Sequence, residues 1–250
     1  MHLVSIITPS FQSEKYIRHT IDAIINQSYT NWELLITDDA STDSTINIIE
    51  SYIVNDARIK LFILSSNSGV AIARNNSLKN ATGRFIAFCD SDDIWSYNKL
   101  QDQITFMISN NYHFTYTHYN YLYNTNTLGK LIISPNKVNY NKIIKNNYIG
   151  CSTVIYDINV VNNFSFPLMN KRQDWAMWIS ILSKVDYAYC YPFSLTFYRI
   201  HNSSLSRNKF KLIIFNYNVY NQYLRFNYFK AIVYLIRFLF FYFKFKFFSK

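Results

Sequence analysis

The stretch that decides the fold is Arg84-Phe85-Ile86-Ala87-Phe88-Cys89-Asp90-Ser91-Asp92-Asp93. Its apolar half follows Thr82-Gly83, which is typical of a helix end, and predicts a buried strand. The three carboxylates that close it repel one another and resist desolvation. A divalent cation and a phosphate-bearing ligand would neutralise them, and such oxygen ligands suit Mg²⁺ or Mn²⁺. The stretch therefore favours a metal–diphosphate site; the alternative is a solvated acidic turn that caps the next helix.

Two earlier apolar runs end in a similar way. Residues 3–7 lead into Thr8-Pro9-Ser10-Phe11, and residues 32–37 lead into Asp38-Asp39. Isoleucines at helical spacing follow each run. Alternating strands and helices predict parallel strands joined by right-handed crossovers, so these loops should share one edge of the sheet. Ligands of open α/β sheets bind at that carboxyl edge.

Length and composition fit one large α/β domain with an appendage. The chain has 250 residues, half of them hydrophobic, with only 4 Gly and 4 Pro, which is enough for a sizeable core. Its 3 cysteines, Cys89, Cys151 and Cys190, are widely spaced in apolar stretches. We therefore expect reduced thiols rather than a disulfide framework or a zinc site. The amino terminus lacks a basic region and a cleavage site, so we expect a cytoplasmic active site.

Successive blocks of the chain resemble those of family 2 inverting glycosyltransferases with the GT-A fold. They match in order and spacing over the first hundred residues, and two more follow near Asp174 and His201. The four blocks are Thr8-Pro9-Ser10-Phe11, Asp38-Asp39-Ala40-Ser41-Thr42-Asp43, Asn67-Ser68-Gly69-Val70-Ala71-Ile72-Ala73-Arg74-Asn75 and Phe88-Cys89-Asp90-Ser91-Asp92-Asp93-Ile94-Trp95.

This resemblance implies a fold and a reaction. The fold is a Rossmann-like α/β domain, with a mainly parallel sheet and flanking helices, over residues 1–206. Within it, residues 1–100 form the nucleotide-sugar-binding half and residues 101–206 the acceptor half. The reaction uses a UDP-sugar and Mn²⁺ or Mg²⁺, and it inverts the anomeric carbon. Dehydrogenase and P-loop functions are excluded, because neither glycine-rich phosphate motif occurs.

The resemblance also implies which residues bind the donor. Pro9, Phe11 and Asp39 are expected to hold the uracil end, with Asp39 accepting the base N–H. Asp90 is expected to meet the ribose or the metal. Asp92 is expected to be the principal metal ligand.

A second chemically loaded stretch runs from residue 172 to 179. Asp174 precedes an amphipathic run, as a helix N-cap would, so a capping role is one interpretation. The family usually has Glu-Asp here, with the Asp as base, and this chain has Gln173-Asp174. The resemblance therefore implies that Asp174 deprotonates the acceptor hydroxyl, the only base that inversion requires when a metal stabilises the leaving diphosphate. Because Gln173 stands where the family usually has Glu, the role of this position stays open.

Arg199 and His201 lie in a loop with several hydroxyl residues, Tyr198-Arg199-Ile200-His201-Asn202-Ser203-Ser204-Leu205-Ser206. Similar loops in the family fold over the diphosphate, which implies a metal or phosphate contact for His201 and the exclusion of water. The alternative is a strand end in solvent.

The middle of the chain is interpreted as the acceptor half. Residues 113–123 are rich in strand-forming side chains, residues 124–129 suit a turn, and residues 130–134 suit a second strand. A short helix is expected near residues 141–147. Residues 150–153 should open another strand, which in the family borders the acceptor.

The net charge of +10 is concentrated at the carboxyl end. Through Ser206 there are 16 Lys and Arg against 15 Asp and Glu, whereas residues 207–250 hold 9 Lys and Arg and no acid. Nucleic acid is one conceivable partner, but residues 238–243 are too apolar for such a surface. A membrane span would need about 20 predominantly apolar residues, and cations interrupt this segment.

Lys230, Arg237 and Lys244 recur at every seventh position and would form one stripe of a helix. We therefore expect residues 207–250 to be a helical segment that lies on an anionic membrane surface. The alternative is that part of this helix packs on the catalytic domain with its lysines outward.

These features together predict an inverting hexosyltransferase at the inner face of the cytoplasmic membrane. It would move a sugar from a UDP-sugar to a polyprenyl-diphosphate-linked sugar in bacterial O-antigen or capsule assembly and form a β-linkage. A processive synthase is not expected, because the chain has neither a set of transmembrane helices nor a Q-x-x-R-W block. A lipooligosaccharide or another glycan is an alternative acceptor. A nucleic-acid-binding protein is the remote alternative.

Overall fold

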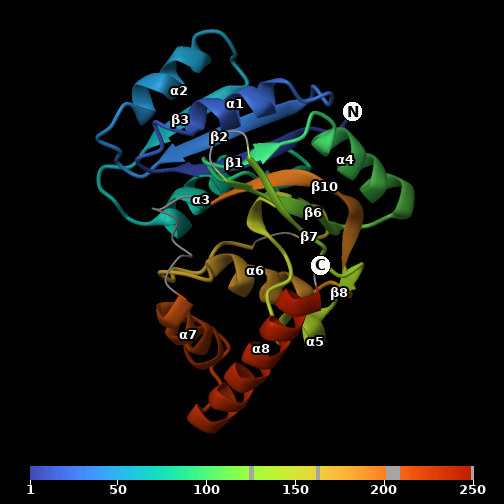
Figure 1. Cartoon of the computed structure of the whole chain (residues 1–250). Coiled ribbons are helices and arrows are strands. Elements are labelled where there is room, and N and C mark those ends of the chain that lie inside the picture. Colours follow the sequence, from blue (N-terminus) through green and yellow to red (C-terminus); the bar gives the residue numbers. More distant parts are fainter. Residues whose placement is uncertain (124–126, 162–163, 201–208, 249–250) are drawn as a thin grey trace.

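The first half of the fold is a parallel sheet crossed by helices. The structure is a computed structural model and describes residues 1–123, 127–161, 164–200 and 209–248. Four strands pair in parallel in the order β3-β2-β1-β4, as Figure 1 shows in blue and teal. These strands and the helices between them are β1 (Val4–Ser10), α1 (Ile17–Ile25), β2 (Trp32–Asp38), α2 (Thr45–Ile53), β3 (Ile59–Ile63), α3 (Val70–Lys79) and β4 (Phe85–Phe88).

The sheet continues beyond β4 with mixed strand directions. β9 (Ile155–Asp157) runs antiparallel to β4 and to β6 (Phe114–Tyr123), whereas β10 (Ala188–Ile200) runs parallel to β6. β5 (Ile94–Trp95) closes this edge against β10. The predicted α/β fold with a mainly parallel sheet and flanking helices is confirmed, and its antiparallel pairs belong to the second half.

Helices cover both faces of the sheet. The isoleucines of α1, together with buried side chains of α2 and α4 (Lys99–Asn110), pack against one face. Side chains of α3 and α6 (Gln173–Leu182) pack against the other. Ile17, Ile21 and Ile24 are fully buried, as their helical spacing predicts.

Gly83 serves a close backbone approach rather than a helix end. α3 ends at Lys79, so the interpretation of Thr82-Gly83 as its end is wrong. A Cβ atom at Gly83 would lie 2.7 Å from the backbone nitrogen of Ser5. The Gly83 N–H donates to Ser5 Oγ at 2.8 Å, so the chain enters β4 pressed against β1.

Residues 101–206 differ from the sequence expectation in the bounds of their elements. β7 (Thr127–Ile132) pairs antiparallel with β6 and begins earlier than residue 130. The short helix α5 (Tyr140–Ile143) ends before residue 147. Cys151–Thr153 form a 3₁₀ turn before β9 instead of the start of a strand. β8 (Lys137–Val138) pairs with β10.

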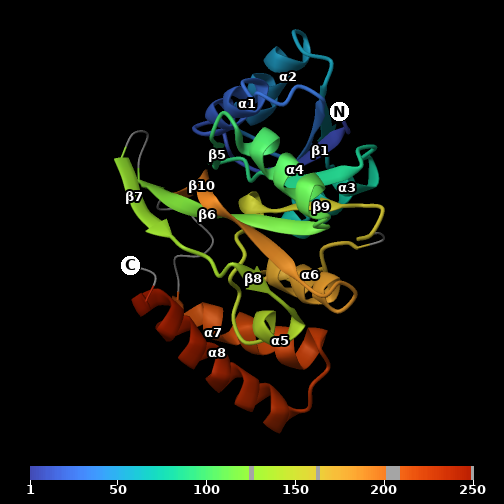
Figure 2. The same cartoon turned by 90° about the vertical axis from the view of Figure 1, so that its right-hand side faces the viewer.

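The carboxyl end is helical, as predicted. α7 (Lys209–Asn218) passes through a π-helical turn (Val219–Tyr223) before α8 (Tyr228–Phe248). Phe238 of α8 is buried against Trp175 of α6, with ring centroids 5.0 Å apart. Figures 1 and 2 both place α8 at the end of the molecule away from α2, with α6 between α8 and the sheet. The predicted boundary after Ser206 lies outside the described residues.

Candidate functional site

The loops that follow β1, β2 and β4 meet at one edge of the sheet, as predicted. Ser10 Oγ, at the end of β1, donates to Asp38 Oδ2 at the end of β2, 2.7 Å away. The hydroxyl of Ser13, in the loop after β1, lies 2.8 Å from that of Ser91, in the loop after β4. These contacts close the carboxyl edge of the parallel sheet into one site.

Asp93 anchors the acidic loop, which comprises residues 90–93, to neighbouring segments. It is fully buried, and its carboxylate accepts hydrogen bonds from Ser152 Oγ at 2.5 Å and from the Arg199 N–H at 3.0 Å. Burial raises the pKa of Asp93 well above its usual range, and the charges of Asp92 and Asp90 add to that rise. Asp93 is thus a structural acid, so the solvated-turn interpretation is wrong for this member of the loop.

Asp90 is paired with a buried arginine. Arg74 Nη2, from α3, lies 2.5 Å from Asp90 Oδ1, and the guanidinium lies over the ring of Phe166 at 5.0 Å. Burial raises the pKa of Asp90, Arg74 opposes this rise, and the charges of Asp92 and Asp174 reinforce it. Four charged groups therefore act on one another at this point.

No role was predicted for Arg74, although the residue stands in the third block of the family resemblance. The sequence signal that could have identified it is a cation on a helix that directly follows a strand ending at this edge of the sheet. Arg74 is 6% exposed, and Asp90 and Asp174 both act to raise its pKa. One guanidinium therefore lies within electrostatic reach of an acid in the loop after β4 and an acid on α6.

Arg199 lies beneath the acidic loop. It is buried near the end of β10, and its Nε donates to the backbone oxygen of Asp92 at 2.8 Å. The solvent-exposed alternative is therefore wrong for Arg199. The Asp92 residue is itself partly exposed. His201 lies outside the described residues.

Asp39 organises the loop between β3 and α3. Its two carboxylate oxygens accept the N–H groups of Ser68 at 2.7 Å and of Gly69 at 2.8 Å. Gly69 has a φ of +95°, a conformation that favours glycine. Each carboxylate oxygen can accept a further hydrogen bond. In the same region Pro9 is buried within β1 and Phe11 is 45% exposed.

Asp174 occupies the first turn of α6 but does not cap it. The N-cap residue is Arg172, in the left-handed conformation with a φ of 68°, and α6 begins at Gln173. The N-cap interpretation of Asp174 is therefore wrong. Asn147 Nδ2 donates to Asp174 Oδ2 at 3.1 Å, and the helix N-terminus favours a negative charge there. Gln173, the departure from the family pattern, is buried.

Three half-buried tyrosines from β6 and β10 lie beside the acidic loop. The ring centroids of Tyr119, Tyr121 and Tyr198 are 5.9 to 6.1 Å apart. Burial raises the pKa of Tyr119, and Asp93 is close enough to contribute to that rise. The alternating Tyr pattern of the strand was visible in the sequence, but its proximity to the acids was not.

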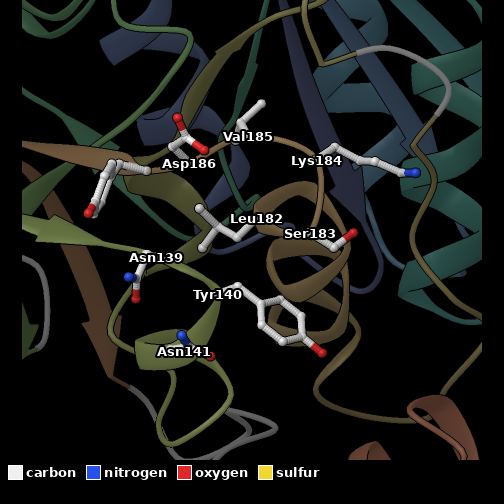
Figure 3. A pocket seen from close by; sticks show the side chains of 9 residues that line it. Asn139, Tyr140, Asn141, Leu182, Ser183, Lys184, Val185 and Asp186 are labelled. Carbon is white, nitrogen blue, oxygen red and sulfur yellow. The ribbon is translucent and has the colours of Figure 1, made fainter.

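A separate hollow lies between α5 and the other end of α6 (Figure 3). Its volume is about 470 Å³, and its lining includes Tyr140, Leu182 and Lys184. Leu182 is eight residues beyond Asp174, or about 12 Å along the helix. The hollow is therefore distinct from the acidic site.

The acidic site suits a metal ion that only one or two protein carboxylates coordinate. Within the described parts of the chain, no three His, Cys, Asp or Glu side chains converge as a metal cluster. Asp90 and Asp92 remain as neighbouring carboxylates. Mg²⁺ commonly takes one or two carboxylates and completes its coordination with substrate phosphates and water, so the donor set fits a metal that binds together with a diphosphate.

Comparisons with known proteins agree with this arrangement. Residues 5–167 match the family described as Glycosyl transferase family 2. The chain is 46% identical over 213 residues to the UDP-Glc:alpha-D-GlcNAc-diphosphoundecaprenol beta-1,3-glucosyltransferase WfgD of Escherichia coli, covering 84% of this chain and 82% of that protein. It is 41% identical to the putative teichuronic acid biosynthesis glycosyltransferase TuaG of Bacillus subtilis, covering 84% and 83% of the two chains.

A solved structure shares the fold. The structure of S. aureus TarS 1-349 in complex with UDP-GlcNAc superimposes with a TM-score of 0.73 at 21% identity, covering 96% of this chain and 72% of that one. The family match and the shared fold therefore both agree with the arrangement of strands and acids at the carboxyl edge of the sheet.

Proposed function

The chain belongs to glycosyltransferase family 2, and on this premise we propose that it transfers a hexose from a UDP-sugar to a sugar on a polyprenyl diphosphate. The transfer inverts the anomeric carbon and forms a β-linkage in the assembly of a bacterial O-antigen or capsule. The relative WfgD, whose name specifies UDP-Glc and a GlcNAc-diphosphoundecaprenol, supports glucose as the first donor to test.

The observation that supports the proposal is the buried guanidinium of Arg74, on which the charges of two acids act. It forms an ion pair with Asp90, at the end of the donor-half strand β4, and the charge of Asp174, on α6 of the acceptor half, also acts on it. The transfer needs a donor diphosphate and an acceptor hydroxyl at one point. An acid at the end of β4 and an acid on α6 that both act on one buried cation support such a meeting point.

On the donor side, Pro9, Phe11 and Asp39 hold the uracil end, with Asp39 accepting the base N–H. Its carboxylate is already fixed by two backbone N–H groups, so it is oriented before the donor binds. Asp92, with Asp90 beside it, would hold Mn²⁺ or Mg²⁺, which neutralises charge on the leaving diphosphate.

Arg199 and His201 are proposed to approach the diphosphate from the end of β10. Arg199 supports the backbone of Asp92, so this strand end and the acidic loop are connected. The assignment of His201 rests on the sequence resemblance.

On the acceptor side, Asp174 takes the proton of the attacking hydroxyl. The hydroxyl oxygen bonds to the anomeric carbon as the bond from that carbon to the UDP oxygen breaks, and UDP leaves with the electron pair. Asn147 orients the carboxylate through its amide. Tyr119, Tyr121 and Tyr198 provide an aromatic wall for the acceptor sugar beside the acids.

The proposed place of work is the inner face of the cytoplasmic membrane. The acceptor class named for WfgD is a lipid diphosphate. Over the residues that the structure describes, no helix has both the length and the apolar character that crossing a bilayer requires. Binding to the bilayer surface is therefore the mode of association that we propose.

A panel of UDP-sugars tests the function. Each is incubated with Mn²⁺ and a synthetic GlcNAc- or GalNAc-diphosphate lipid, and the product is identified by mass spectrometry and its linkage by NMR. We expect one UDP-hexose to give a β-linked disaccharide lipid. An α-linked product, or transfer from none of the UDP-sugars to either lipid, would contradict the proposal.

A different acceptor is the second candidate. TuaG, 41% identical, is named for teichuronic acid biosynthesis, so the panel should include a teichuronic acid fragment and a lipooligosaccharide. Transfer to one of these alone would retain the enzyme class and replace the acceptor. Nucleic acid is not expected as a partner, because residues 238–243 are too apolar for a nucleic-acid-binding surface.

A further inference from the structure

The helix α8 has two apolar faces, and only one is packed against the protein. Ala231 and Phe238 are buried against the catalytic domain. On the outward face the exposed fractions of large apolar side chains are high, from 46% to 80%. The members of this outward stripe are Phe229, Val233, Ile236, Phe240 and Phe243. Their spacing of four and three residues places them along one line of the helix.

A row of cations lies beside the outward stripe. Lys230, Arg237 and Lys244 each follow a stripe residue by one position, and all three are exposed. Residues 207–250 contain no Asp or Glu. The outward face is therefore apolar along its centre and positively charged along its side.

We propose that this outward face of α8 docks into the interface of a lipid leaflet with anionic headgroups. The proposal rests on the proposed function, since it supplies the surface on which a lipid-linked acceptor would be met. The apolar stripe would enter the acyl boundary while the cations remain at the headgroups. Each cation near an anionic leaflet adds to the attraction.

The charge pattern favours a leaflet over a second copy of the chain. A twofold dimer would pair this face with itself, which would bring Lys230, Arg237 and Lys244 of both copies into one interface with no acid on the helix to neutralise them. An anionic leaflet matches both the stripe and the cations. It also suits a helix of 21 residues, about 31 Å long, that can lie flat on a surface.

The packed face of α8, opposite the outward stripe, contacts the helix that carries Asp174. Phe238 of α8 packs on Trp175 of α6, with ring centroids 5.0 Å apart, and Trp175 follows Asp174 directly. Trp175 is itself fixed, because its Nε1 donates to the Ile143 carbonyl at 2.8 Å. Docking of α8 would therefore orient the helix that carries the proposed base toward the leaflet.

The test measures co-sedimentation of the full chain with vesicles of phosphatidylglycerol and phosphatidylcholine. We expect the triple variant Lys230→Glu, Arg237→Glu and Lys244→Glu to bind at least tenfold less vesicle than the parent chain. The double variant Ile236→Ser and Phe240→Ser should also bind less, although it keeps every cation. A matched control changes the exposed Lys79, Lys137 and Lys184 to Glu and should bind as the parent does.

The outcomes separate this proposal from the proposed function. Binding by the triple variant equal to that of the parent would overturn the proposal, and so would an equal loss in the matched control. A third outcome is that the parent chain does not bind vesicles but forms a dimer, and that the triple variant is monomeric. This result would assign the outward face to a second copy of the chain. Transfer to a short-chain soluble acceptor should survive in every variant. If the parent lacks that transfer yet binds vesicles, the proposed function fails and the docking face stands.

Discussion

Arg74, on α3, and Asp90, in the loop after β4, form an ion pair with 2.5 Å between Nη2 and Oδ1. Arg74 is 6% exposed, so each charge depends on the other for neutralisation. Removing one partner leaves the other charge buried without a counter-charge. We therefore expect Arg74→Gln to lower the free energy of unfolding by roughly 3 kcal/mol. UDP affinity should fall with it.

A double-mutant cycle checks this pair. Arg74→Gln combined with Asp90→Asn should destabilise less than the sum of the single variants in urea unfolding, because the second change removes the stranded carboxylate. Strict additivity would show that the two side chains do not depend on each other.

Asp92→Asn tests the proposed metal ligand. The side chain keeps its size, so we expect unchanged thermal unfolding but loss of Mn²⁺-dependent UDP binding in calorimetry, and loss of turnover. Asp93→Asn is the matched control, because Asp93 accepts hydrogen bonds from Ser152 and Arg199. That variant should lower the unfolding temperature. Near-normal turnover of Asp92→Asn, or full activity in excess EDTA, would refute the assignment.

Asp174→Asn separates chemistry from binding. The amide oxygen can still accept from Asn147, yet the side chain cannot take a proton. Turnover should fall by about 10² or more while UDP affinity stays within about threefold. Steady-state kinetics and UDP titration measure the two effects. A parallel loss of UDP binding would make Asp174 a donor-site residue instead.

Glu33 should make stability depend on pH. Burial alone would raise its pKa, but hydrogen bonds from Ser5, Lys60 and Thr82 lower it to about 2 from the usual 4.5. A depressed folded pKa stabilises the fold above pH 4.5, and that contribution disappears as the pH falls toward 2. It amounts to roughly 3 kcal/mol at pH 7 and about 1 kcal/mol at pH 3.

Urea unfolding of the parent and of Glu33→Gln at the two pH values measures this contribution. The difference between them should shrink by about 2 kcal/mol from pH 7 to pH 3. An unchanged difference would show that the charge of Glu33 does not matter to the fold.

The sequence predicted three of the four parallel strands, β1, β2 and β4, because strands that are buried on both sides appear as unbroken apolar runs. It did not predict β3, most of whose side chains are exposed or half-buried. The residues alone could not separate Asp92 from Asp93, which are adjacent and chemically identical; the assignment of Asp92 as the metal ligand came from the family resemblance. The distinction depends on an N–H of β10, at Arg199, more than a hundred residues away. The ion pair of Arg74 likewise depends on how α3 packs relative to the loop after β4. The side of α8 that packs on the domain is set by its fit to α6.

The contact between Trp175 and Phe238 has a consequence for the length of the acceptor. If α8 rests on the leaflet, packing rather than a flexible tether sets how high Asp174 stands above the lipid headgroups. A lipid-linked sugar whose hydroxyl reaches that height can react. After one addition the new terminal sugar stands farther from the bilayer, beyond the base. We therefore expect the enzyme to add a single sugar and then to stop, because the position of Asp174 above the leaflet is fixed by the fold.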